Sequence, residues 1–228
     1  ASGMIGYVNT TINTPESLIC ITRPRRFGKS AAAQMLYAYY DKSSDSRNLF
    51  ERFQVARDPT FEQHLNKYPA IFIDMTEFTT KFKGRADIVD LIQKIVIKDV
   101  SKAYPDIEIE EYDDLMDVLL KIVMATGEKF VMIIDEWDAI CREAEDKPQL
   151  MDSYVNLLRR LFKGGNTAIA FALVYMTGIL PIKRYGTQSA LNDFREYSMT
   201  NPWQLAPYFG FTEDAVKGLC KKHSMDYD

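Results

Sequence analysis

Four short and nearly uninterrupted apolar runs constrain the fold of this chain more than any other feature. They cover residues 17–22, 70–74, 130–134 and 168–175, and segments with helical hydrophobic spacing lie between them. Strands that are apolar at every position are buried on both faces, as in a parallel sheet covered by helices. The alternation of strands and helices therefore predicts an α/β fold, with a mostly parallel sheet and helices on both faces.

The segments between the apolar runs carry the helical signal. Predicted helices cover residues 30–40, 86–103, 112–126, 150–161 and 189–194, and a last one begins after Thr212. Apolar residues recur at helical spacing in the longer of these segments. Gly127 is a C-cap glycine for the third helix. The polar stretch 41–48 and residues 78–83 are predicted loops.

A basic segment follows the first apolar run and precedes an alanine-rich helix. It reads Arg23-Pro24-Arg25-Arg26-Phe27-Gly28-Lys29-Ser30. Its end fits the phosphate-loop pattern G-x-x-x-x-G-K-[ST], but Arg23 replaces the first glycine. Gly28 lets the backbone approach a phosphate, and the N–H groups at the start of the helix face the anion.

This segment predicts a nucleotide-binding loop, and a surface turn with a basic tip is the alternative interpretation. Lys29 would lie between the terminal phosphates, and the Ser30 hydroxyl would bind Mg²⁺. The predicted nucleotide contacts are Arg23, Pro24, Arg25, Arg26, Phe27, Gly28, Lys29, Ser30 and Ala31.

The third apolar run ends in two acids, Asp135 and Glu136, as in a Walker B strand. Ligands of open α/β folds bind at the carboxyl ends of the strands, where Asp135 would hold Mg²⁺. Glu136 would act as general base on the attacking water. The alternative is a pair of acids that stabilises a helix N-terminus. Asp138 either supports the site or caps the following turn.

Other polar residues also follow the predicted strands. Thr177 comes after the fourth strand, where it would contact the γ-phosphate or the attacking water, or would be an ordinary strand-end hydroxyl. Asp74 ends the second strand and is a candidate or a bystander. The nearby cations that could neutralise transition-state charge are Lys183, Arg184 and Arg195.

Composition limits the class of protein. The chain has 228 residues, a net charge of −4, three scattered cysteines and two histidines. These values exclude a wholesale basic surface for nucleic acid and favour a reducing, cytoplasmic location over a disulfide scaffold. The longest apolar stretch, residues 168–180, is too short to cross a bilayer, so we expect no membrane partner.

Four motifs together resemble the bacterial AAA-ATPase-like family, whose members are often fused to a C-terminal nuclease-like domain of the PD-(D/E)xK type. They lie at residues 22–30, 133–138, 176–192 and 209–216, and the resemblance runs from about Gly3 to Cys220. It implies an additional-strand P-loop fold that binds ATP with Mg²⁺ through Lys29, Ser30, Asp135 and Glu136. It also implies that arginine in place of the loop glycine is the family's own pattern.

The chain departs from the family in three places. Many members carry a Tyr-Val-Asp-Lys element upstream of the residues at which this chain begins. Some members have arginine where Pro181 stands here. The fused nuclease-like domain is absent from this sequence. We therefore expect a P-loop NTPase core over residues 1–200 and the truncated start of a helical lid over residues 201–228.

These observations predict an ATP-binding domain that hydrolyses ATP with Mg²⁺ to drive conformational change in a larger multidomain protein. The first alternative is a nucleotide-binding interaction module with little turnover. The second is a nucleic-acid-binding domain that uses Arg23, Arg25 and Arg26 on backbone phosphates. Expected partners are a nucleotide, further copies of the chain in a homo-oligomer, and the nuclease-like domain.

Overall fold

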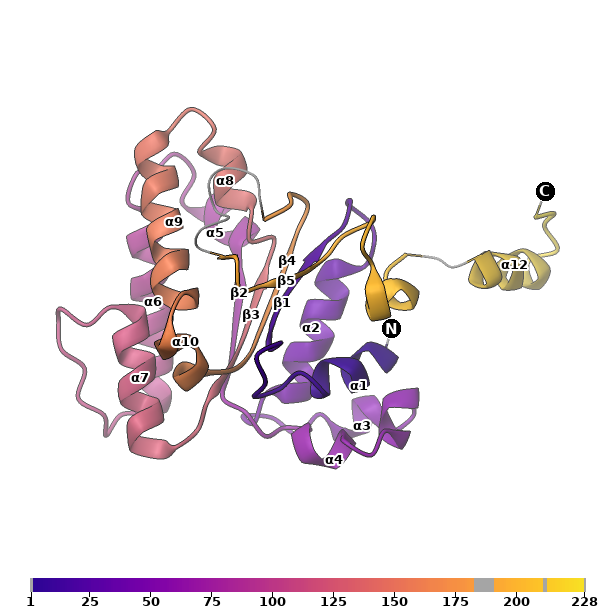
Figure 1. Cartoon of the computed structure of the whole chain (residues 1–228), viewed down its shortest axis with the longest axis horizontal. Coiled ribbons are helices and arrows are strands. Elements are labelled where there is room, and N and C mark those ends of the chain that lie inside the picture. Colours follow the sequence, from indigo (N-terminus) through magenta and orange to yellow (C-terminus); the bar gives the residue numbers. More distant parts are fainter. Residues whose placement is uncertain (1, 183–190, 211–212, 228) are drawn as a thin grey trace.

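The computed structural model describes residues 2–182, 191–210 and 213–227, and within them a single five-stranded sheet (Figure 1). The strand order is β2-β3-β4-β1-β5, and all four pairings are parallel. β4 lies between β1 and β3, which is the position of the additional strand. The predicted fold class is therefore confirmed. The strands are β1 (Leu18–Thr22), β2 (Ala70–Asp74), β3 (Phe130–Asp135), β4 (Phe171–Gly178) and β5 (Arg195–Tyr197).

Helices cover both faces of the sheet. In Figure 1, helices α1 to α4 lie on one side, and α5 to α10 lie on the other. The helices are α1 (Gly3–Asn9), α2 (Lys29–Tyr40), α3 (Arg47–Phe50), α4 (Phe61–His64), α5 (Met75–Lys81), α6 (Ile88–Ala103), α7 (Leu115–Thr126), α8 (Ala139–Glu143), α9 (Pro148–Phe162), α10 (Gly165–Ala170) and α12 (Glu213–Lys222). Two short 3₁₀ helices, η1 (Gln54–Arg57) and η2 (Trp203–Tyr208), complete the described elements.

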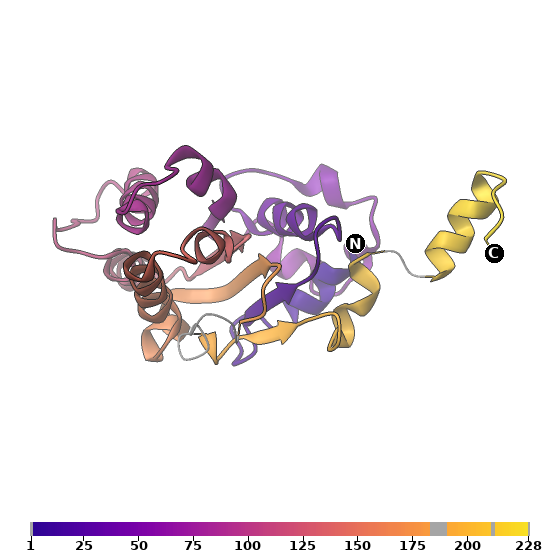
Figure 2. The same ribbon diagram turned by 90° about the horizontal axis from the view of Figure 1, so that it is seen from above.

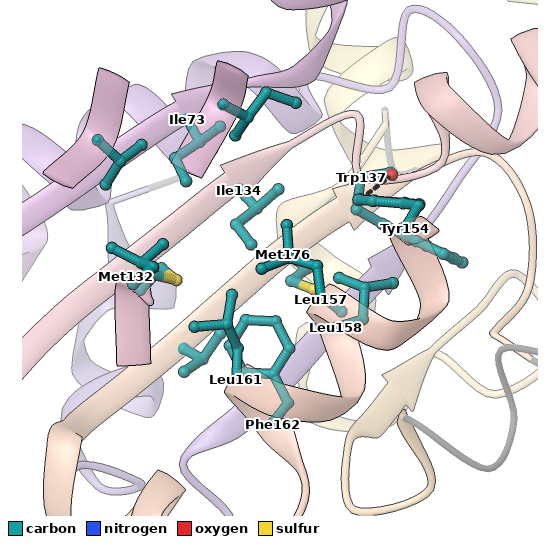
Figure 3. Close-up of a cluster of buried hydrophobic side chains, with 14 of the residues drawn as sticks. Ile73, Met132, Ile134, Trp137, Tyr154, Leu157, Leu158, Leu161, Phe162 and Met176 are labelled. Atoms are coloured by element: carbon teal, nitrogen blue, oxygen red, sulfur yellow. Dashed lines mark hydrogen bonds between the residues drawn. The ribbon is translucent and has the colours of Figure 1, made fainter. Parts of the chain in front are cut away.

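The sheet divides the core into two clusters because successive side chains of a strand point to opposite faces. On β3, Met132 and Ile134 belong to the cluster under α9, whereas Ile133 belongs to the cluster under α2. Figure 3 shows the first cluster, in which leucines of α9 pack on the β3 side chains. There the Tyr154 hydroxyl donates to the Trp137 carbonyl at 2.6 Å, which ties α9 to the end of β3.

Local capping sets two of the helix ends. Asp74 accepts hydrogen bonds from the N–H groups of Thr76 at 2.8 Å and Glu77 at 3.2 Å, so α5 begins directly after β2. The predicted loop over residues 78–83 is therefore wrong, because most of it is the second half of α5. At Gly127 the prediction is confirmed, with a left-handed φ of 75° after α7.

The fourth strand lies later in the chain than the sequence indicates. Residues 168–170 belong to α10, and β4 continues to Gly178. Thr177 is therefore inside the strand rather than after it. The short strand β5 and the first helix, α1, were not predicted at all.

The C-terminal region is described in part. The first two residues of the predicted helix over 189–194 fall outside the described residues, and Thr212, after which the last helix was predicted to begin, falls outside them too. Figures 1 and 2 both show α12 standing apart from the body of the domain. No helix among the described residues combines the length and the apolar character needed to cross a membrane.

Candidate nucleotide-binding site

Parallel strands bring the predicted motifs to one edge of the sheet. Asp74 is paired in register with Asp135, and Thr22 is paired with Gly178. The chain segments that follow β1, β2, β3 and β4 therefore meet at the carboxyl edge, which is where open α/β sheets bind ligands. Figure 1 draws α8 at the same end of the sheet as the connection between β1 and α2.

The predicted phosphate loop ends at a helix N-terminus that has no side-chain cap. Gly28 occupies the N-cap position of α2 with a φ of 78°, and a Cβ added there would meet nothing within 4 Å. A left-handed φ favours glycine, and the Gly28 position supplies no side-chain cap to the first N–H groups of this 12-residue helix. This geometry is suited to an anion.

Lys29 connects the phosphate loop to the acidic strand end. Its side chain is only 4% exposed, and its Nζ donates to the Pro24 carbonyl at 3.2 Å. The same Nζ lies 3.5 Å from Oε1 of Glu136. Ser30 and Ala31, the next residues of α2, are exposed. Lys29 and Glu136, about a hundred residues apart in the sequence, thus lie together at one site.

Thr177 joins the two acids at the end of β3. Its hydroxyl donates to Oδ1 of Asp135 and accepts from the Glu136 N–H at 3.2 Å. Its carbonyl accepts from the Trp137 N–H at 2.8 Å. Glu136 has a φ of 52°, which is uncommon for a residue with a side chain and is typical of functional sites. Thr177 and Asp135 are both buried.

Glu136 also contacts Arg142, a residue of α8 that the sequence analysis did not single out. Nη2 of Arg142 lies 3.0 Å from Oε2 of Glu136, and Nη1 lies 2.7 Å from Oδ2 of Asp138. Asp138 is fully buried and accepts the N–H groups of Ile179 at 3.2 Å and Leu180 at 2.9 Å. Its side chain makes no hydrogen bond that caps α8, and it contacts Arg142 and the chain after β4 instead.

The charge of Arg142 is stabilised by its neighbours. Burial by itself favours the neutral form, but the carboxylates of Asp138 and Glu136 outweigh it and raise the pKa of Arg142. The available sequence signal for this residue was its spacing, four residues after Asp138 on a helix.

Arg23 is buried beneath the loop. It is 3% exposed, and its Nη1 donates to the carbonyls of Tyr197 at 2.8 Å and Thr22 at 3.2 Å. Its backbone N–H donates to the Gly178 carbonyl at 3.2 Å, and its guanidinium lies 5.9 Å from the centre of the Phe209 ring. Burial lowers the pKa of Arg23. Both the guanidinium and the N–H thus bind protein carbonyls.

The other residues of the loop lie nearer to solvent. Pro24, Arg25 and Arg26 are exposed, and Arg26 has a left-handed φ of 68°. Phe27 is half-buried against Gly210. A Cβ added to Gly210 would lie 3.0 Å from the Phe27 ring.

The remaining candidates lie elsewhere or outside the described residues. Arg195 pairs with Glu16 at 2.6 Å, before the start of β1 and hence at the opposite end of the sheet from Lys29. Lys183 and Arg184 fall outside the described residues. Asp74 is at the correct edge, but its side chain caps α5.

The oxygen donors of this edge are chemically suited to Mg²⁺. A carboxylate at Asp135 and a hydroxyl at Ser30 are hard ligands of the kind that this ion prefers. Within the described part of the chain, no group of three or more His, Cys, Asp or Glu side chains could hold a metal ion. Mg²⁺ in nucleotide sites needs fewer protein ligands than that, because phosphate oxygens and water supply the rest.

The strand order and the loop at the carboxyl edge of β1 define the class of protein, which is the P-loop NTPase fold. Residues 6–187 match the family model described as AAA-ATPase_like, predicted AAA-ATPase, and the chain belongs to this family. A search among curated proteins found no match. Family membership makes this a nucleotide-binding, ATPase-like domain.

Proposed function

We propose that this domain binds ATP together with Mg²⁺ and hydrolyses it, and that turnover drives conformational change in a larger multidomain protein. The observation that supports this proposal most is the 3.5 Å contact between Lys29 and Glu136. It joins the predicted phosphate-binding cation and the predicted general base at the carboxyl edge of the sheet. A buried lysine at the base of an uncapped helix N-terminus is well placed to receive phosphate.

Each residue has a defined part in the proposed reaction. Lys29 would exchange Glu136 for the terminal phosphates, while the N–H groups at the start of α2 bind phosphate oxygens. Ser30 and Asp135 would hold Mg²⁺, which neutralises charge that develops on the phosphates. Thr177, which binds Asp135, would orient it and face the attacking water.

Glu136 would take a proton from water as the water oxygen bonds to the γ-phosphorus. The bond between that phosphorus and the oxygen bridging to the β-phosphate breaks, and ADP leaves with the bond electrons. The site thus releases phosphate and ADP, with the proton held first by Glu136.

Calorimetric titration of ATP and GTP, with and without Mg²⁺, tests the binding part of the proposal. Lys29→Ala should abolish ATP binding. Lys42→Ala is the matched control, because Lys42 also pairs with a glutamate, Glu128, but lies beyond the other end of α2. A wild-type protein that binds no nucleotide at millimolar concentration would refute the proposal.

Phosphate release tests the chemical part. Glu136→Gln should keep ATP binding and lower the turnover rate by roughly 10²- to 10⁴-fold, the usual contribution of a general base. If wild-type turnover is no faster than that of Glu136→Gln, the domain is a nucleotide-binding module with little turnover.

The nucleic-acid alternative is weakened by the burial of Arg23, because only Arg25 and Arg26 remain exposed among the three arginines. A titration of DNA and RNA in rising salt, with ATP as competitor, tests it. The domain boundaries, the helical lid, the homo-oligomer and the nuclease-like partner remain predictions.

A further inference from the structure

The carboxylate of Glu136 is held between two cations, one on each oxygen. Lys29 lies 3.5 Å from Oε1, and Arg142 lies 3.0 Å from Oε2. Lys29 belongs to the loop that would bind phosphate, whereas Arg142 belongs to α8. When phosphates take Lys29, Arg142 is the cation that stays with Glu136.

Arg142 is itself held in a fixed position. Its other nitrogen pairs with Asp138 at 2.7 Å, and the two residues are one helical turn apart. Asp138 is fully buried and is bound by two N–H groups of the chain directly after β4. The guanidinium therefore connects the Glu136 carboxylate to a buried carboxylate that two backbone N–H groups also bind.

We infer that Arg142 is a positioning residue for Glu136, a role that rests on the function proposed above. Before nucleotide binds, Arg142 restrains Glu136 and limits its competition with phosphate for Lys29. After nucleotide binds, Arg142 keeps the Glu136 carboxylate in place for the attacking water. A guanidinium suits this task because it can pair with two carboxylates at once, here through a hydrogen bond to Glu136 at 3.0 Å and an ion pair with Asp138 at 2.7 Å.

The direction of the effect on binding follows from this competition. Without Arg142, Glu136 has Lys29 as its remaining cation partner in this network and pairs with it more strongly. ATP must then displace a tighter ion pair, so its affinity falls. The effect requires the charge of Glu136, so Glu136→Gln should remove it.

The test measures ATP affinity by calorimetry with Mg²⁺ present, and the turnover rate, for Arg142→Gln and Arg142→Lys. We expect Arg142→Gln to weaken ATP binding about three- to fivefold, the upper part of the range for one partly exposed ion pair. Its kcat should fall by about tenfold or more, since small misplacements of catalytic groups cost that much. Arg142→Lys should recover part of both losses.

Two comparisons separate positioning from a general structural role. In the Glu136→Gln background, Arg142→Gln should change ATP affinity less than about twofold, because paired residues are not additive. Arg160→Gln is the matched control, since Arg160 of α9 also bridges two acids, Asp114 and Asp117, both at the start of α7. If Arg142→Gln fails to fold in a melting experiment, Arg142→Lys is compared with wild type in the same way.

Each outcome decides between the proposals. If wild type binds ATP and Arg142→Gln behaves as Arg160→Gln does, the inference is wrong and the proposed function stands. An equal loss of affinity with and without the Glu136 charge also refutes it. If wild type binds no ATP, the proposed function fails and the inference fails with it.

Discussion

Replacing Arg23 by alanine tests whether the arginine that takes the place of the loop glycine is a structural residue. The change removes a guanidinium that donates to the Tyr197 carbonyl at 2.8 Å and to the Thr22 carbonyl at 3.2 Å. Hydrogen bonds of charged groups contribute about 1.5 to 3 kcal/mol. The contact with the Phe209 ring at 5.9 Å adds about 0.5 to 1 kcal/mol.

Together these losses predict a decrease of about 2 to 4 kcal/mol in the free energy of unfolding. For a chain of this size each kcal/mol shifts the melting temperature by about 2 to 4 °C, so Arg23→Ala should melt roughly 5 to 15 °C lower. Screening by solvent does not reduce this figure much, because Arg23 is 3% exposed.

Thermal melting followed by circular dichroism, together with urea unfolding, measures the effect. Arg25→Ala is the matched control, because Arg25 belongs to the same loop but is exposed. It should change the stability by no more than about 0.5 kcal/mol. Equal melting temperatures for the two variants would refute the structural role of Arg23.

Two further predictions concern packing and pH. Gly178→Ala places a Cβ 2.6 Å from Nε1 of the buried Trp137 and should cost about 1 to 3 kcal/mol in urea unfolding. Gly165→Ala, where the new Cβ meets nothing within 4 Å, should leave the stability nearly unchanged. Similar losses of stability in Gly178→Ala and Gly165→Ala would contradict the steric argument. Burial lowers the pKa of His64 below 6.5, so the unfolded chain binds the proton more readily and stability is lost as the pH falls below that value. His64→Gln should reduce this loss of stability between about pH 7.5 and 5.5, measured as the urea midpoint at each pH. If the variant and the wild type lose stability equally over this range, His64 is not the cause.

Much of the sheet could be predicted from the sequence because its strands are buried on both faces. Continuous apolar runs identified β1, β2 and β3 within one or two residues, and located β4 with an error of three residues. β5 could not be found in this way, because it is only three residues long and two of them, Arg195 and Glu196, are charged. The helix α5 was missed because its start depends on the Asp74 side chain rather than on apolar spacing.

The residue types of the site were predictable, but their contacts were not. A glycine, a lysine and a serine at a helix start, and two acids after an apolar strand, indicate phosphate and metal chemistry through their local pattern. The pairing of Lys29 with Glu136 depends on how β1, β4 and β3 are ordered in the sheet.

The sequence by itself determined the class of fold and the chemistry offered at the edge of the sheet, because apolar runs, helical spacing and the residue types at strand ends are local patterns. Only the tertiary structure decided that Arg23 lies beneath the loop, bound to carbonyls of β1 and β5. Only the tertiary structure also decided that Arg142 reaches Glu136. The Arg23–Tyr197 contact joins segments far apart in the sequence, so it depends on the packing of the whole domain. The Arg142–Glu136 contact is closer in sequence, but it depends on the turn after β3, where Glu136 has a left-handed φ and its N–H donates to Thr177 of the neighbouring strand.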